Sequence, residues 1–136
     1  MNCPFGHILA AAAAAALCIP LAHAEGDASA GKLLYASKCA ACHSLEYNGT
    51  GPSHKNLFGR RAGTVPGFAY SQALKDSGVT WGPETLARWL TDPEKFIPGQ
   101  RMFISVPDAK ERADLIAWLR VATAQPQPTT HPGASQ

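Results

Sequence analysis

Hydrophobic and polar positions near the carboxyl end of the chain repeat with the period of an α-helix. The apolar positions fall at i, i+1, i+4 and i+7 and form one stripe: Leu115, Ile116, Leu119 and Ala122. Just upstream, Asp108 follows a proline and precedes Glu111 by three residues, which is the spacing of an N-terminal cap. This pattern predicts a helix that begins after Asp108 and buries one face.

Shorter segments upstream also have helical patterns or helix-start signals. They are residues 27–42, 71–77, 83–91 and 92–97. The last two open with a proline in the first turn, where its missing N–H does no harm. Residues 48–66 contain Asn-Gly, Gly-Pro and further glycines, which is typical of loops. No segment alternates like a strand, so the chain is predicted to be all-α, with about four to five helices.

The two ends differ in composition from the middle. A polar lead and an apolar run that ends at Ala22-His23-Ala24 predict a cleaved export signal over residues 1–24. The run is shorter than the roughly 20 residues of a membrane span, so the protein is not expected to span a membrane. Residues 25–124 are predicted to form one domain, and the proline-rich residues 125–136 a disordered tail. Export predicts a periplasmic location.

Charge and composition exclude several function classes. The 12 basic and 10 acidic residues all follow the predicted signal and give a formal charge of +2. No dense basic tract is present, so no nucleic-acid partner is predicted. No catalytic arrangement of Ser, His and Asp and no paired carboxylates stand out, so the chain is predicted not to be an enzyme.

The strongest chemical signal is Cys39-Ala40-Ala41-Cys42-His43. Two thiols three positions apart followed by a histidine predict covalent attachment of one haem c, with Cys39 and Cys42 as thioethers and His43 as an iron ligand. A redox dithiol or half of a zinc site are the alternatives. The cysteines at 3 and 18 leave with the signal, so no second pair remains for zinc.

The second axial ligand of the iron is predicted to be Met102. It follows Pro98-Gly99 in a turn-rich segment, about sixty residues beyond the haem motif. Core filler is the ordinary role of a methionine. His54 is the competing ligand, but it lies only eleven residues after His43, and a short loop would struggle to reach the opposite face.

Several motifs together resemble class I c-type cytochromes, in particular the soluble bacterial type similar to mitochondrial cytochrome c. The resemblance covers about residues 26–121 and rests on the haem motif and five further segments: Leu57–Thr64, Gly67–Ser71, Val79–Trp81, Phe96–Met102 and Arg112–Leu119. It implies the cytochrome c fold, with the helices around one covalently attached haem.

The resemblance also implies roles for single residues. The carbonyl of Pro52 is expected to accept a hydrogen bond from the His43 ring. The haem propionates are expected to be bonded by Arg60, Tyr70 and Trp81, because a buried carboxylate needs donors. A solvated pair with Arg61 is the other interpretation of Arg60. Gly31 and Tyr35 on the first helix are expected to cross Leu115 and Trp118 on the last.

The sequence departs from the family pattern at four pocket positions. Gln100 replaces a common threonine, Trp89 a common tyrosine, Leu74 a common asparagine, and His54 an apolar residue. The chain is therefore expected to have a less polar pocket on the methionine side. The sequence does not give the direction in which the reduction potential shifts, since lost hydrogen bonds and lost solvent act differently.

The predicted function is an exported, monomeric one-electron carrier whose iron cycles between Fe(III) and Fe(II). Its expected partners are transient redox proteins: a membrane oxidase or reductase, or a periplasmic dehydrogenase. The candidate docking cations are Lys38, Lys55, Lys95 and Arg101. Two alternatives stay open from sequence: a haem enzyme or ligand sensor with a displaceable Met102, and a dedicated electron-transfer subunit of one periplasmic enzyme.

Overall fold

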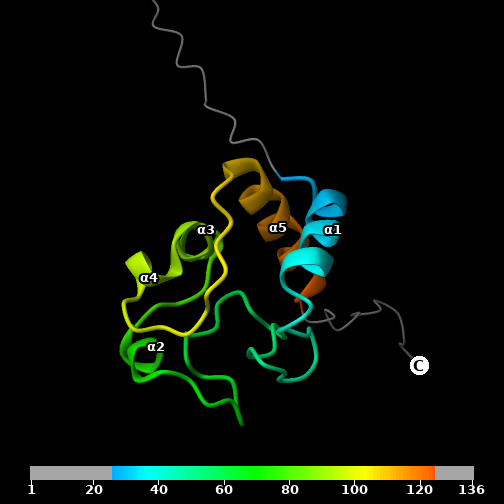
Figure 1. Ribbon diagram of the computed structural model, residues 1–136. Coiled ribbons are helices and arrows are strands. Elements are labelled where there is room, and N and C mark those ends of the chain that lie inside the picture. The colour runs from blue at the N-terminus through cyan, green and yellow to red at the C-terminus, as the bar shows by residue number, and fades with distance from the viewer. Residues whose placement is uncertain (1–25, 125–136) are drawn as a thin grey trace, which may run out of the picture.

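The computed structural model describes residues 26–124, which form a small helical fold (Figure 1). Its helices are α1 (Ala28–Lys38), α2 (Gln72–Asp76), α3 (Pro83–Thr91), α4 (Pro93–Phe96) and α5 (Ala109–Ala122). The described residues contain no strand, only an isolated antiparallel bridge between Arg61 and Thr80. The all-α prediction is therefore confirmed. None of the helices in residues 26–124 has the length and apolar character needed to cross a membrane.

Helices α1 and α5 pack side by side and make one side of the fold, while α2, α3 and α4 make the other (Figure 1). At the α1–α5 crossing, a Cβ on Gly31 would overlap the carbonyl oxygen of Asp114 and lie 2.9 Å from Cβ of Trp118. Only glycine allows this close approach of the two backbones. The ring of Tyr35 packs beside it, with its centroid 4.4 Å from that of Trp118. The crossing of α1 and α5 is present, with Gly31 against the backbone of Asp114 and Tyr35 against Trp118.

Helix α1 ends earlier than the sequence pattern predicts, at Lys38 rather than Cys42. The carbonyl of Tyr35 accepts N–H groups from both Cys39 and Ala40, at 2.9 and 3.0 Å, so the Ala40 N–H no longer follows the i−4 pattern of the helix. The carbonyl of Cys39 then accepts the N–H groups of Cys42 and His43, at 3.0 and 2.9 Å. The haem motif is therefore a separate, hydrogen-bonded turn that follows α1.

Helix α5 follows the predicted pattern. The carboxylate of Asp108 accepts the Glu111 N–H at 2.8 Å and caps the helix. The side chain of Glu111 does not reach back to the cap, because it pairs with Lys38 at the end of α1, 3.4 Å away. The predicted stripe faces inward, with Leu115 only 1% exposed and Leu119 5%.

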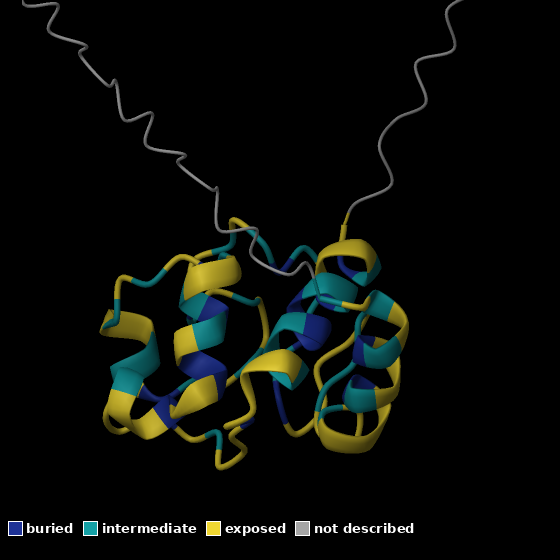
Figure 2. Ribbon diagram, turned by 90° about the horizontal axis from the view of Figure 1, so that it is seen from above, coloured by how far each residue is buried: buried dark blue, intermediate teal, exposed yellow. Residues whose placement is uncertain are grey.

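The three short helices α2, α3 and α4 also lie where the sequence predicts them. Ser71 and Asp92 cap α2 and α4 through their side chains, and α3 and α4 begin with proline. Trp89 on α3 is 7% exposed and packs edge-on against Trp81, with 5.5 Å between ring centroids. Buried positions lie on the inward faces of the helices on both sides (Figure 2). The loops between these two groups of helices carry the candidate site.

Candidate cofactor site

The two cysteines lie on the single turn that follows α1. Both thiols are free, with Cys39 half-buried and Cys42 exposed. Burial raises the pKa of the Cys39 thiol to about 11, with a smaller raising effect from Cys42 and an opposing one from Lys38. Among residues 26–124, no group of three or more His, Cys, Asp or Glu side chains is placed to hold a metal ion such as zinc. A pair of thiols on one turn beside a histidine fits attachment to a porphyrin instead.

The ring of His43 is held in one orientation. Its Nδ1 lies 2.8 Å from the carbonyl oxygen of Pro52. A carbonyl can only accept, so Nδ1 carries the hydrogen and Nε2 keeps a free lone pair. Burial lowers the pKa of His43, which favours the neutral ring that binds a metal. A Cβ on Gly51 would overlap this ring, so the glycine makes room for it.

His54 lies beside His43 rather than opposite it. The two rings stack with 4.3 Å between centroids and an interplanar angle of 19°. That spacing leaves no room for a porphyrin between them, which argues against His54 as the second axial ligand of a haem bound by His43. Burial, followed by the positive charges of His43 and Arg60, lowers the pKa of His54 to about 3, so its ring is neutral.

Met102 lies on the loop between α4 and α5 and is half-buried against the core. Its backbone N–H donates to the side-chain oxygen of Gln100, which is itself 7% exposed. The Gln100 amide donates to Glu94 at 3.3 Å, and Glu94 also accepts the Gly99 N–H at 2.9 Å. Sequence reasoning noted Gln100 only as a departure and missed Glu94. An acidic residue at that point of a four-residue helix gives no signal on its own.

Two of the three residues with an implied propionate role, Arg60 and Trp81, meet through their backbones. The backbone N–H of Trp81 donates to the backbone carbonyl of Arg60 at 2.9 Å. Burial raises the pKa of Tyr70, while a hydrogen bond with the Val65 backbone and then the Arg60 charge lower it. Arg60 donates to the carbonyl of Ser53 at 2.9 Å and to that of Lys55. Arg60 is thus half-buried, whereas Arg61 is exposed, so the solvated-pair interpretation does not fit Arg60.

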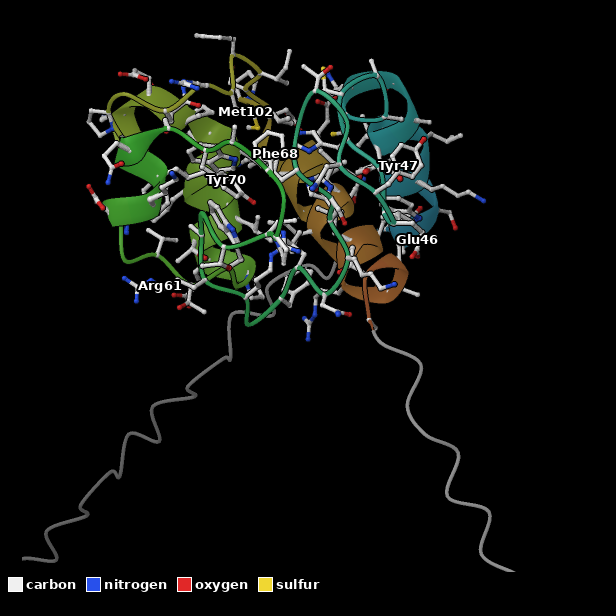
Figure 3. The ribbon with its side chains drawn as sticks, turned by 90° about the horizontal axis from the view of Figure 1, so that it is seen from below. Glu46, Tyr47, Arg61, Phe68, Tyr70 and Met102 are labelled. Atoms are coloured by element: carbon white, nitrogen blue, oxygen red, sulfur yellow. The ribbon has the colours of Figure 1, made fainter. Side chains whose placement is uncertain are left out.

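Figure 3 places Met102 and Tyr70 on the same side of the molecule as α2 to α4, while Glu46 and Tyr47 lie beside α1. Two of the four candidate docking cations are engaged in ion pairs. Lys38 pairs with Glu111 at 3.4 Å, and Lys55 pairs with Glu46 at 3.1 Å. Lys95 and Arg101 are exposed. These four cations, here called the positive rim, are therefore partly neutralised by neighbouring acids.

A family model for cytochrome c matches residues 28–123 of this chain. The chain belongs to the cytochrome c family. It is 48% identical over 103 residues to the cytochrome c of Chlamydomonas reinhardtii. This match covers 73% of this chain and 92% of that protein. The cytochrome c of Sesamum indicum is 44% identical, with coverage of 73% and 93%. Cytochrome cH from Methylobacterium extorquens is similar in structure, with a TM-score of 0.68, 46% identity, and coverage of 71% of this chain and 99% of that one.

Membership of this family establishes the cofactor and the general activity. This cytochrome c carries one covalently attached haem c and is an electron carrier, not an enzyme. The donor set described above fits that cofactor: a thiol pair on one turn, an imidazole with a free Nε2, and a half-buried thioether on a separate loop.

Proposed function

We propose that this cytochrome c is an exported one-electron carrier that serves periplasmic or membrane redox partners. The bound haem supplies a reversible couple between Fe(III) and Fe(II). The chain supplies two ligands that stay in place in both states, so that little reorganises when an electron moves. The predicted signal at residues 1–24 supports export; it lies outside the described residues, as does the predicted tail at 125–136.

The residues proposed to hold the haem are Cys39 and Cys42 as thioethers and His43 and Met102 as axial ligands. The observation that carries this assignment is the 2.8 Å hydrogen bond from His43 Nδ1–H to Pro52, which leaves Nε2 free for a metal. A thioether as the second ligand favours ferrous iron and raises the potential relative to two histidines.

The surrounding residues are proposed to orient and protect this group. Gln100 holds the backbone of Met102 in place. Arg60, Tyr70 and Trp81 are proposed to bond the propionates, directly or through water. The described chain satisfies the Arg60 guanidinium with backbone carbonyls, so the role of Arg60 also includes holding the loop at residues 53–55.

Absorption spectra of the holoprotein test the ligand assignment. The protein is produced with haem-attachment machinery, and ferric and ferrous spectra are recorded with and without carbon monoxide. We expect low-spin spectra, a ferric thioether charge-transfer band and no response to carbon monoxide. Met102→Ala should lose that band and bind carbon monoxide, because it empties one coordination position.

High-spin spectra or carbon monoxide binding in the unmutated protein would contradict the Met102 assignment. The same preparation tests export. Mass spectrometry of the periplasmic fraction is expected to give the mass of a mature chain that begins at Glu25. Elution as a free monomer supports a diffusing carrier, whereas constant co-purification with one large enzyme would favour a dedicated subunit.

A further inference from the structure

Two polar side chains are paired in the core between α1 and the loop that follows the haem motif. Tyr35 is 6% exposed, and its hydroxyl lies 3.2 Å from Nδ1 of His54. Their rings meet edge to face, with 5.7 Å between centroids. The Tyr35 ring also packs against Trp118 of α5, with 4.4 Å between centroids. The hydroxyl is therefore aimed at His54 by the same packing that joins α1 to α5.

His54 in turn contacts the proposed ligand and the residue that follows it. Its ring stacks on the ring of His43 at 4.3 Å, within 19° of parallel. Its backbone N–H donates to the carbonyl of Ser44, the residue after His43, at 2.8 Å. A chain of contacts thus runs from Trp118 through Tyr35 and His54 to the ring of His43.

The two restraints on the His43 ring are different in kind. The hydrogen bond to Pro52 places Nδ1 and so limits rotation of the ring about its Cβ–Cγ bond from one edge. The stacked His54 ring limits the same rotation by contact with one face of the imidazole. An aliphatic side chain at position 54 would fill the volume without fixing a plane.

We propose that Tyr35 and His54 act as a polar pair that, together with the Pro52 hydrogen bond, sets the plane of the His43 imidazole, so that His54 is a positioning residue for the proximal ligand. This inference rests on the proposed ligation by His43 and Met102. It predicts that the orientation of the ligand depends on the ring at position 54, and that the hydroxyl of Tyr35 holds this ring in place.

The test uses holoprotein variants Tyr35→Phe, His54→Leu and the double variant, with Tyr47→Phe as the control because Tyr47 is 71% exposed. Urea denaturation measures stability. Each single variant leaves one buried polar group without its partner, so both should be destabilised. The double variant removes both groups, and its loss should be clearly smaller than the sum of the single losses.

Proton NMR of the ferric holoprotein separates positioning from packing. The spread of the haem methyl shifts reports the plane of the axial imidazole. We expect His54→Leu to change this spread. The double variant should change it as well, although its loss of stability is smaller than the sum of the single losses. Tyr47→Phe should leave it unchanged. His54→Asn, which keeps an acceptor for Tyr35 but no stacked ring, should also change it and covers the case in which the leucine variant fails to fold.

Methyl shifts that match the unmutated protein in His54→Leu or His54→Asn would overturn the positioning role. Additive stability losses in the double variant would overturn the pairing with Tyr35. Absence of the upfield Met102 methyl resonance from the unmutated ferrous protein would instead contradict the proposed function, so the two failures are distinguishable.

Discussion

At the residue scale, the chemistry of this cytochrome c depends on which atom each side chain leaves free. His43 donates from Nδ1 and keeps the Nε2 lone pair, while the hydrogen bond to Met102 is made by its backbone N–H and not by its side chain. Gln100, which accepts the Met102 N–H, also donates to Glu94, and Glu94 accepts the N–H of Gly99. These contacts join the loop that carries the proposed ligand to α4.

Gln100→Ala should therefore make Met102 easier to displace. The change removes one hydrogen bond to the Met102 backbone and one to Glu94, each with a net value of about 1 kcal/mol. Imidazole titration of the ferric protein should show roughly two- to tenfold tighter binding, because the ligand competes with Met102 for the iron. Arg101→Ala, an exposed change in the same loop, is the control. Equal imidazole affinities in all three proteins would show that Gln100 does not hold the loop.

At the element scale, the α1–α5 pair supports the site because the haem motif begins where α1 ends. Asp114 of α5 is 4% exposed, and its carboxylate accepts the Asp27 N–H at 2.7 Å and the Lys110 ammonium at 2.6 Å. These hydrogen bonds, the one from Lys110 first, lower the pKa of Asp114. One ionised side chain thus joins the start of α1 to the middle of α5.

Asp114→Asn should lower stability at neutral pH and change its dependence on acid. Because the folded pKa is lowered, the carboxylate contributes fully above the unfolded pKa of about 3.9, and its contribution is lost as the pH falls through the folded pKa. The difference in unfolding free energy between the unmutated protein and Asp114→Asn should be constant above about pH 5 and shrink below about pH 4.

Urea denaturation between pH 7 and pH 3 measures this difference, with Asp76→Asn on the exposed surface of α2 as the control. A difference that stays constant to pH 3 would mean that ionisation of Asp114 does not stabilise the crossing.

At the scale of the whole molecule, the formal charge of +2 is small, and the nearby acids reduce the positive rim further. Lys38 directly precedes Cys39, yet it pairs with Glu111 of α5. Exposed pairs of this kind contribute little to stability, but they do change the local potential that a partner meets. Encounter with charged partners should therefore depend only weakly on salt.

Glu111→Gln should release the Lys38 charge and speed reaction with an anion. Stopped-flow oxidation of the ferrous protein by hexacyanoferrate(III) at low ionic strength should be roughly twofold faster than in the unmutated protein, from a charge about 10 Å away. The gain should disappear above about 0.5 M salt. Glu84→Gln on α3 makes the same change in net charge and should have a smaller effect. Equal rates for the two variants would mean that net charge alone sets the encounter.

The sequence by itself determined the elements and the chemistry. Prolines and caps fixed the starts of α3, α4 and α5, and the apolar stripe fixed the buried face of α5, because these are local effects. The haem motif identified the cofactor, because two thiols and an imidazole at that spacing have few other uses. The early end of α1 was missed, because the competing hydrogen bonds of the motif turn are not visible as a pattern.

Only the tertiary structure decided which distant residues meet. Met102 depends on Glu94 through Gln100, Tyr35 meets His54 across 19 positions, and Glu111 turns from its own helix cap to Lys38. In the sequence, His54 was a competing ligand; in the fold, it stacks on His43 and supports it. Such contacts depend on how α1, α5 and the loops pack, and this packing follows from burial of the whole core rather than from any local sequence signal.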